Sequence, residues 1–196
     1  MITRYQYGRC IHTGAVVEEL PVREGFPEEL VRSEDQLTLK ARMEEDEVVY
    51  GLGEQVRGLN KRGWIYVSDN ADEPNHYEDK RSLYASHNLL ILASPKRKGV
   101  RGYFFDVPGR VTFDIGFAKK DELAVILSEP FLDLYVLEED SLPALAHAFR
   151  GLVGRSYIPP FFAFGFGQSR WGYRSADEIR EVARNYKVAG FPIDMI

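Results

Sequence analysis

Apolar and polar residues alternate with a period of two along much of the first two thirds of this chain. The alternation is clear in residues 37–41 (LTLKA) and again in residues 111–117 (VTFDIGF). Successive side chains of a strand point to opposite faces, so this spacing directs one apolar face to a core and the other face to solvent. The chain also contains 12 Phe and 11 Tyr residues, and aromatic side chains favour the half-buried surface of a sheet. The pattern predicts a fold that is mainly β.

Three further runs are apolar on both faces, as central strands of a sandwich are. They cover residues 89–92, 103–105 and 123–127. Turn signals separate the runs, with Ser-Pro at 94–95, Pro-Gly at 108–109 and Glu-Pro at 129–130. Many short strands at this spacing predict an antiparallel β-sandwich.

The pattern changes near residue 141. Ser141 can cap a helix, and the apolar residues that follow it fall on one helical face, namely Leu142, Leu145, Phe149 and Leu152. Gly154 can end that helix. Pro159 and Pro160 come next, and each removes a backbone donor and disfavours helix before it. We therefore expect a domain boundary here, with the sandwich at residues 1–155 and a second domain at residues 156–196.

A strand–helix–strand unit is predicted after the boundary. Residues 161–167 (FFAFGFG) and 191–196 (FPIDMI) are short apolar runs. Between them Ser175 and Glu178 have the spacing of a capping box, which begins a helix that Gly190 can end. Such a unit normally belongs to a parallel sheet with neighbouring strands on both sides. We expect the first βαβ unit of an α/β barrel or doubly wound sheet, truncated in mid-strand.

Charge and composition argue against several classes of function. The net charge of -5 disfavours a nucleic-acid partner, which needs a cationic surface. No apolar run is long enough to span a bilayer, and the N-terminus lacks the apolar core of a signal peptide, so we expect a cytoplasmic protein without a membrane partner. The single cysteine, Cys10, excludes an internal disulfide, and the four histidines show no metal-ligand spacing, so no metal is expected.

Two glycine pairs, at 51/53 and 165/167, begin like a dinucleotide-binding fingerprint. The third glycine is missing in both, because Val56 and Arg170 stand in its place. We therefore interpret these glycines as bulges or points of close backbone approach, and we expect no cofactor.

Several isolated polar residues have plain structural interpretations. Asp106, Asp114 and Asp133 lie in strand patterns, where a solvent-facing position is expected. His87 begins an apolar strand and is interpreted as a hydrogen-bonded structural residue, and His147 as a solvated helix residue.

Two segments could contact a ligand. The turn at residues 168–173 (QSRWGY) follows the first strand of the second domain, and ligand sites of parallel sheets lie at the carboxyl ends of strands. Its Trp171 could stack on a sugar ring or could pack in a barrel mouth. The loop at residues 68–76 (SDNADEPNH) is rich in carboxylates, which accept hydrogen bonds from sugar hydroxyls. It could equally be a solvated surface loop, and its spacing does not fit an EF-hand.

Longer motifs resemble glycoside hydrolase family 31. In the first domain they are residues 49–54 (VYGLGE), 60–63 (NKRG), 78–84 (EDKRSLY), 104–106 (FFD) and 112–114 (TFD). Residues 157–173 (YIPPFFAFGFGQSRWGY) look like the beginning of that family's catalytic barrel, and residues 191–196 look like its second barrel strand. The resemblance runs from about residue 40 to the end and is strongest to bacterial α-glucosidases.

This resemblance implies a galactose-mutarotase-like β-sandwich followed by a (β/α)₈ barrel. It implies retaining hydrolysis of terminal α-linked glucose from α-glucoside oligosaccharides, which uses two carboxyls about 5–5.5 Å apart. The family's nucleophile and acid/base would lie beyond Ile196. Two substrate-binding residues are carried over, namely Asp72 from the first domain's loop and Trp171 from the Arg-aromatic-Gly-Tyr turn.

The alternative is a stand-alone carbohydrate-binding or interaction domain that uses the same sandwich. Such a module has no use for a barrel strand followed by a helix. Exposed barrel strands could also pair with other copies of the chain and give a homo-oligomer.

The 196-residue chain should not hydrolyse maltose, isomaltose or a nitrophenyl α-glucoside. A loop aspartate and an indole cannot replace the paired general acid and nucleophile. Turnover by the purified chain, after contamination is excluded, would contradict the assignment of the chemistry to residues beyond Ile196.

Overall fold

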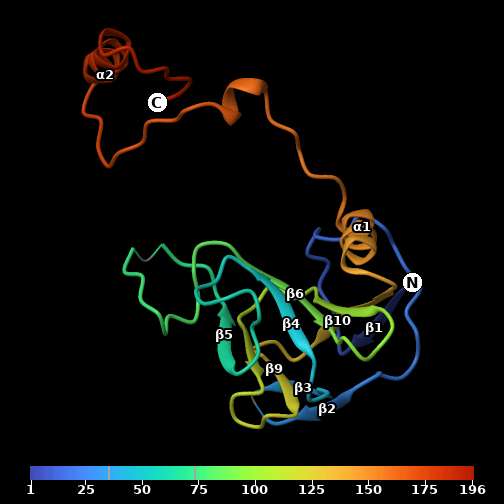
Figure 1. Cartoon of the computed structure of the whole chain (residues 1–196). Coiled ribbons are helices and arrows are strands. Elements are labelled where there is room, and N and C mark those ends of the chain that lie inside the picture. Colours follow the sequence, from blue (N-terminus) through green and yellow to red (C-terminus); the bar gives the residue numbers. More distant parts are fainter. Residues whose placement is uncertain (35, 73) are drawn as a thin grey trace. The chain divides into compact units, whose positions relative to one another are not determined.

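The computed structural model describes residues 1–34, 36–72 and 74–196. The chain divides into two compact units, Met1–Arg155 and Ser156–Ile196 (Figure 1). No helix among the described residues has the length and apolar character needed to cross a membrane.

The first unit is a β-sandwich of two antiparallel sheets, as the alternating pattern predicts. Within the described residues each sheet has five strands. The first sheet runs in the order β1 (Ile2–Tyr7), β10 (Leu132–Glu139), β7 (Val100–Phe105), β6 (Ser86–Ala93) and β4 (Val48–Gly53). The second sheet runs in the order β2 (Glu29–Arg32), β3 (Leu37–Arg42), β9 (Glu122–Leu127), β8 (Val111–Ile115) and β5 (Trp64–Ser68).

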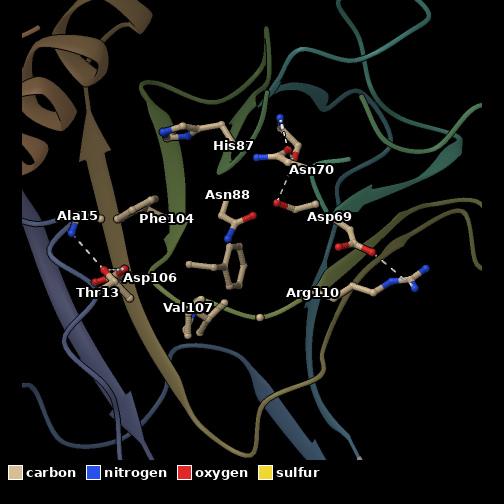
Figure 2. Close-up of a pocket in the computed structure, with 15 residues that line it drawn as sticks. Thr13, Ala15, Asp69, Asn70, His87, Asn88, Phe104, Asp106, Val107 and Arg110 are labelled. Atoms are coloured by element: carbon tan, nitrogen blue, oxygen red, sulfur yellow. Dashed lines mark hydrogen bonds and ion pairs between the residues drawn. The ribbon is translucent and has the colours of Figure 1, made fainter. Parts of the chain in front are cut away.

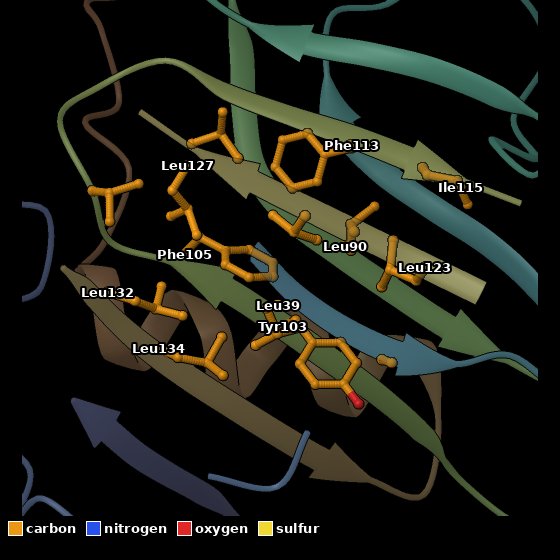
Figure 3. Packing of buried hydrophobic residues seen from close by; sticks show 14 of the residues in the cluster. Leu39, Leu90, Tyr103, Phe105, Phe113, Ile115, Leu123, Leu127, Leu132 and Leu134 are labelled. Carbon is orange, nitrogen blue, oxygen red and sulfur yellow. The ribbon is translucent and has the colours of Figure 1, made fainter. Parts of the chain in front are cut away.

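The main core lies between the two sheets (Figure 3). Every second residue of β8 and β9 is fully buried there, including Phe113 and Val125. Phe105 of the first sheet meets Phe113 edge-on, with ring centroids 5.7 Å apart. The period-two prediction is therefore confirmed at the level of side chains, since the alternate residues of these strands are the ones that the opposite sheet covers.

A second apolar layer covers the outer face of the first sheet. Helix α1 (Leu142–Val153) packs Leu145 and Leu152 against Phe104 and Leu137 of that sheet. The predicted caps are confirmed. Ser141 accepts a hydrogen bond from the Ala144 amide at 3.3 Å, and Gly154 ends the helix with φ +88°. The β6 and β7 runs are apolar on both faces because each face has its own cover.

The first glycine pair forms a β-bulge in β4, as interpreted from the sequence. The register with β6 shifts between Gly51 and Gly53, and Gly51 has φ +110°. A Cβ at Gly51 would overlap the carbonyl oxygen of Leu89. The position therefore needs glycine both for its backbone conformation and for the close approach of β6.

The second unit contains helix α2 (Ala176–Val188) and the 3₁₀ helix η1 (Phe161–Phe164). The predicted strand over residues 161–167 is wrong for its first part, because η1 occupies it and Phe161 is 94% exposed. Within residues 156–196, all of which the structure describes, parallel pairing is limited to a bridge between Gly167 and Met195. A strand needs a partner along its length, and without one residues 161–164 satisfy their backbone locally through bonds such as the Ala163 amide to the Pro160 carbonyl at 2.9 Å.

Gly51→Ala should destabilise the sandwich strongly. The new methyl group adds backbone strain and a steric overlap with Leu89, so we expect the free energy of unfolding to fall by about 3 kcal/mol or more. Gly63→Ala is the matched control, because Gly63 also has positive φ but has no atom within 4 Å of the added Cβ. It should cost about 1–2 kcal/mol from strain alone. Equal losses in urea unfolding would contradict the overlap argument.

Candidate functional site

The polar loop leaves the sandwich between β5 and β6, at one end of the second sheet. Its base is held by side chains. The Asn70 carboxamide oxygen accepts from the Ser86 amide at 2.8 Å and from the Ser86 hydroxyl at 2.5 Å. The Ser82 hydroxyl donates to the Asp69 carbonyl at 2.8 Å, and the Lys80 ammonium donates to the Asn75 carbonyl at 3.1 Å. The loop is thus pinned at both ends.

Asp72 lies in the part of the loop between these anchors and is exposed. Its neighbour Glu73, which the sequence analysis counted in the carboxylate-rich loop, lies outside the described residues. An exposed carboxylate on a loop with fixed ends can reach a ligand without first leaving a packed position. The substrate-binding role of Asp72 stays a prediction.

The aromatic turn of the second unit is organised around Glu178. This carboxylate forms an ion pair with Arg170 and accepts from the Arg174 amide at 2.8 Å. The Arg170 guanidinium in turn lies 4.8 Å from the centroid of the Tyr173 ring. The predicted Ser175 cap is present, with its hydroxyl 3.2 Å from the Glu178 amide. The Glu side chain, however, reaches back to Arg174 rather than to the amide of the cap residue.

Trp171 stands at the tip of this turn and is 102% exposed. Arg170, directly before it, pairs with Glu178 and lies over the ring of Tyr173, two residues after it, so the indole is presented on a supported turn. The base of the turn is held by the Tyr186 hydroxyl of α2, which donates to the Gln168 side chain at 2.5 Å. Asp72 and Trp171 belong to different units.

Asp194 has a structural role that the sequence analysis did not assign. Its carboxylate accepts from the Phe166 amide at 2.9 Å, beside the bridge between Gly167 and Met195. A Cβ at Gly165 would overlap this carboxyl group. The second glycine pair therefore serves close approach, as interpreted, and the side chain that approaches Gly165 is Asp194 from the segment after α2.

Two aspartates interpreted as solvent-facing are buried, and that interpretation is wrong for them. Asp133 of β10 is 3% exposed, and Asp106, which directly follows β7, is 8% exposed. The Arg4 guanidinium holds Asp133 through two bonds of 3.0 and 2.6 Å, and Gln6 adds a third at 3.0 Å. The residues that pair with Asp133 come from β1, 127 and 129 positions away in sequence, so the strand pattern could not reveal them.

Asp106 is held by Thr13, whose hydroxyl donates to its carboxylate at 2.5 Å. Burial raises the pKa of Asp106 and the Asp133 charge raises it further, while the Thr13 bond, His12 and Arg4 oppose the shift. The third aspartate, Asp114, is half-buried and accepts from the Phe117 amide at 2.9 Å.

The two histidines that the sequence singled out differ in their surroundings. His147 is exposed on α1, as expected. His87 packs on rings, with its centroid 6.0 Å from Phe104 and 5.6 Å from Phe149. Among the described residues no group of three or more His, Cys, Asp or Glu side chains is placed to hold a metal ion.

A cavity of about 490 Å³ lies beside the base of the polar loop (Figure 2). Asp69 and Asn70 of the loop line it together with His87 and Asn88 of β6 and the segment from Phe104 to Arg110. Figure 2 shows that these side chains come from separate strands and surround one space. No sequence motif pointed to this cavity.

Both units match known families. Residues 13–114 match the Glycosyl hydrolase 31 N-terminal galactose mutarotase-like domain. Residues 156–196 match the Glycosyl hydrolases family 31 TIM-barrel domain.

Individual relatives agree with these matches. An α-glucosidase of Saccharolobus solfataricus is 28% identical over 85% of this chain and 24% of its own length. The α-glucosidase 2 of Bacillus thermoamyloliquefaciens is 31% identical over 79% of this chain and 19% of its own length. The Flavobacterium johnsoniae GH31 dextranase, solved in complex with glucose, superposes with a TM-score of 0.76 at 25% identity, over 84% of this chain and 20% of that one. The chain thus spans about a fifth to a quarter of the length of these relatives.

Asp106→Asn should change how stability depends on pH. The raised pKa means that Asp106 ionises first in the unfolded chain, near pH 4, as the pH rises. Wild type therefore loses stability until the pH passes the raised pKa of the folded state, whereas the amide does not ionise. The unfolding free energy of the variant minus that of wild type should grow over this window and then level off. Asp177→Asn, on an exposed carboxylate, controls for charge loss alone, and the same slope in both variants would contradict the burial argument.

Proposed function

The chain belongs to glycoside hydrolase family 31, and on that premise we propose that it forms the N-terminal part of a retaining α-glucosidase. The sandwich supports a (β/α)₈ barrel and contributes the polar loop to the substrate site. The full enzyme releases terminal α-linked glucose from oligosaccharides.

The order of the two matched segments carries this proposal. A mutarotase-like sandwich and the first part of a barrel follow one another in a single chain, as residues 13–114 and 156–196. A binding module that works alone needs no barrel segment, so this arrangement favours an enzyme over a stand-alone carbohydrate-binding or interaction domain.

We base the proposed preference for α-glucosides on the relatives. Two of them are named α-glucosidases, and the dextranase was solved with glucose bound. Another relative is named Alpha-xylosidase 1, from Arabidopsis thaliana, at 27% identity. We therefore propose glucose as the sugar at the cleaved end of the substrate. Xylose is the competing sugar, so activity on α-xylosides is to be measured beside activity on α-glucosides.

The two units would contribute different chemistry to this substrate. A carboxylate accepts charge-assisted hydrogen bonds from sugar hydroxyls, which fits the exposed Asp72 on its pinned loop. An indole offers a flat apolar wall to the C–H face of a sugar ring, which fits the exposed Trp171. Neither residue is proposed to take part in bond cleavage, which the family's two aspartates would perform.

The product of the complete reading frame tests the proposal directly. It should hydrolyse nitrophenyl α-glucoside with retention of the anomeric configuration, which NMR of the first-formed glucose detects. It should act on nitrophenyl α-xyloside more slowly. A protein that binds maltose without hydrolysing any α-glycoside would support the stand-alone binding domain instead.

Asp72→Ala in that full-length protein should lower kcat/KM by about one to two powers of ten. Charge-assisted hydrogen bonds contribute about 1.5–3 kcal/mol, and about 1.36 kcal/mol corresponds to a factor of ten. Asp79→Ala is the matched control, because Asp79 is another exposed carboxylate of the connection between β5 and β6. A melting curve of each variant excludes unfolding. Asp72→Ala kinetics equal to wild type would remove Asp72 from the substrate site.

Trp171→Tyr should change the ratio of kcat/KM between maltose and isomaltose. The smaller ring alters the wall that the second sugar contacts, and the two disaccharides place that sugar differently. Because the indole is fully exposed within this chain, the substitution should leave the melting temperature of the 196-residue chain unchanged. An unchanged substrate ratio together with a lower melting temperature of the full-length protein would show that Trp171 packs instead.

A further inference from the structure

The cavity beside the polar loop lies where two strands part. β6 and β7 are paired from Ala93 and Val100 as far as Leu89 and Phe104. β7 then continues along β10, where Phe105 pairs with Leu134. β6 instead runs back to Ser86, which pairs with Gly53 across the bulge of β4. The space at this fork is the cavity of about 490 Å³.

Asn88 stands in the fork (Figure 2). It has the same parity on β6 as Leu90 and Leu92, which are buried in the main core. Its side-chain oxygen is buried and has no hydrogen-bond partner among the described residues. An unpaired buried acceptor is costly, so a strand that retains one at a cavity wall invites a ligand that supplies the missing donor.

The other polar groups supply both donors and acceptors. On the loop side, the Ser68 and Ser86 hydroxyls lie 3.1 Å apart, beside the Asn70 carboxamide. On the opposite side, Asp106 and Thr13 form their 2.5 Å bond (Figure 2). Hydroxyls and carboxamides both donate and accept, which matches the alternating hydroxyl groups of a sugar.

An aromatic ring, that of His87, also lines the cavity. The His87 ring stacks on Phe104 with an angle of 25° between the ring planes. Burial lowers the pKa of His87, so the imidazole is neutral at neutral pH and offers one donor and one acceptor. Aromatic faces of this kind suit the C–H face of a pyranose.

Charge selects against anions. Asp69 and Asp106 line the cavity, and Arg110 is already engaged by Asp69 at 3.8 Å. The carboxylates outnumber the one cationic side chain among the lining residues, so a phosphorylated sugar would be repelled. A neutral ligand has no such penalty.

We propose that this cavity is a non-catalytic binding site for a neutral saccharide, separate from the site assigned to Asp72 and Trp171. Its volume lies within the range of about 300–1,000 Å³ that is usual for small-molecule pockets. The open, polar walls fit a weak site with a Kd in the millimolar range. All the lining residues belong to the sandwich, so binding at this cavity does not depend on which α-glycoside the full enzyme cleaves.

The test is a titration of the ¹⁵N-labelled 196-residue chain with maltose, followed by NMR. Saturable shifts should appear at the backbone amides of residues 86–88, 104–107 and 109–110. Shifts confined to residues 71–76 or 168–175, or no saturable shift, would overturn the proposal. Glucose 6-phosphate should bind more weakly than glucose, and tighter binding of the phosphate would contradict the charge argument.

Asn88→Leu should weaken maltose binding at least tenfold while the protein stays folded. The substitution keeps the branching of the side chain and removes an unpaired buried oxygen, so we expect no loss of stability. Arg110→Gln, on a side chain that is 60% exposed, provides a second variant at the rim that keeps the fold and should also weaken binding. Asp177→Asn, on an exposed side chain of α2 with no role in sugar binding, is the control and should bind maltose as wild type does. Wild-type binding by a folded Asn88→Leu protein would refute the site.

Discussion

Both faces of the central strands β7 and β10 are covered, and the rest of the sandwich depends on this constraint. The inner face packs on the second sheet through residues such as Leu134, and the outer face packs on α1 through residues such as Leu137. A polar residue on either face must then find a partner, because burial without one costs several kcal/mol. The bidentate bond between Arg4 and Asp133 meets that requirement and also attaches β1 to the edge of the sheet.

The sequence predicted those features that depend on near neighbours. Alternation defines a strand within five residues, and a helix cap needs only the residue three positions on, as Ser141 and Ala144 illustrate. The burial of Asp106 and Asp133 depends instead on segments about 90 to 130 positions away, from Arg4 to Thr13. A strand pattern records which residues share a face, but it does not record what covers that face.

The second unit also shows that a local pattern does not record which partners a segment will have. Its helix α2 forms as predicted, with its Ser175 cap, although none of its residues is buried. Residues 161–164 have the apolar composition of a buried strand and yet form a 3₁₀ turn. Helical hydrogen bonds are satisfied within the segment, whereas those of a strand need a partner. This unit supplies such a partner for residues 166–168, which pair with residues 194–195.

The candidate sites also differ in whether a local sequence pattern indicates them. Asp72 and Trp171 were reached through the resemblance to a family, since exposed loop residues leave no periodic signal. The cavity arises where the β6–β7 pairing ends, which no local pattern encodes, yet one residue does mark it. Asn88 precedes the apolar run at residues 89–92 and shares the core-facing parity of Leu90. A carboxamide at a core-facing position is costly in a closed sandwich, so its presence in the sequence is itself a signal that the sheet opens at that point.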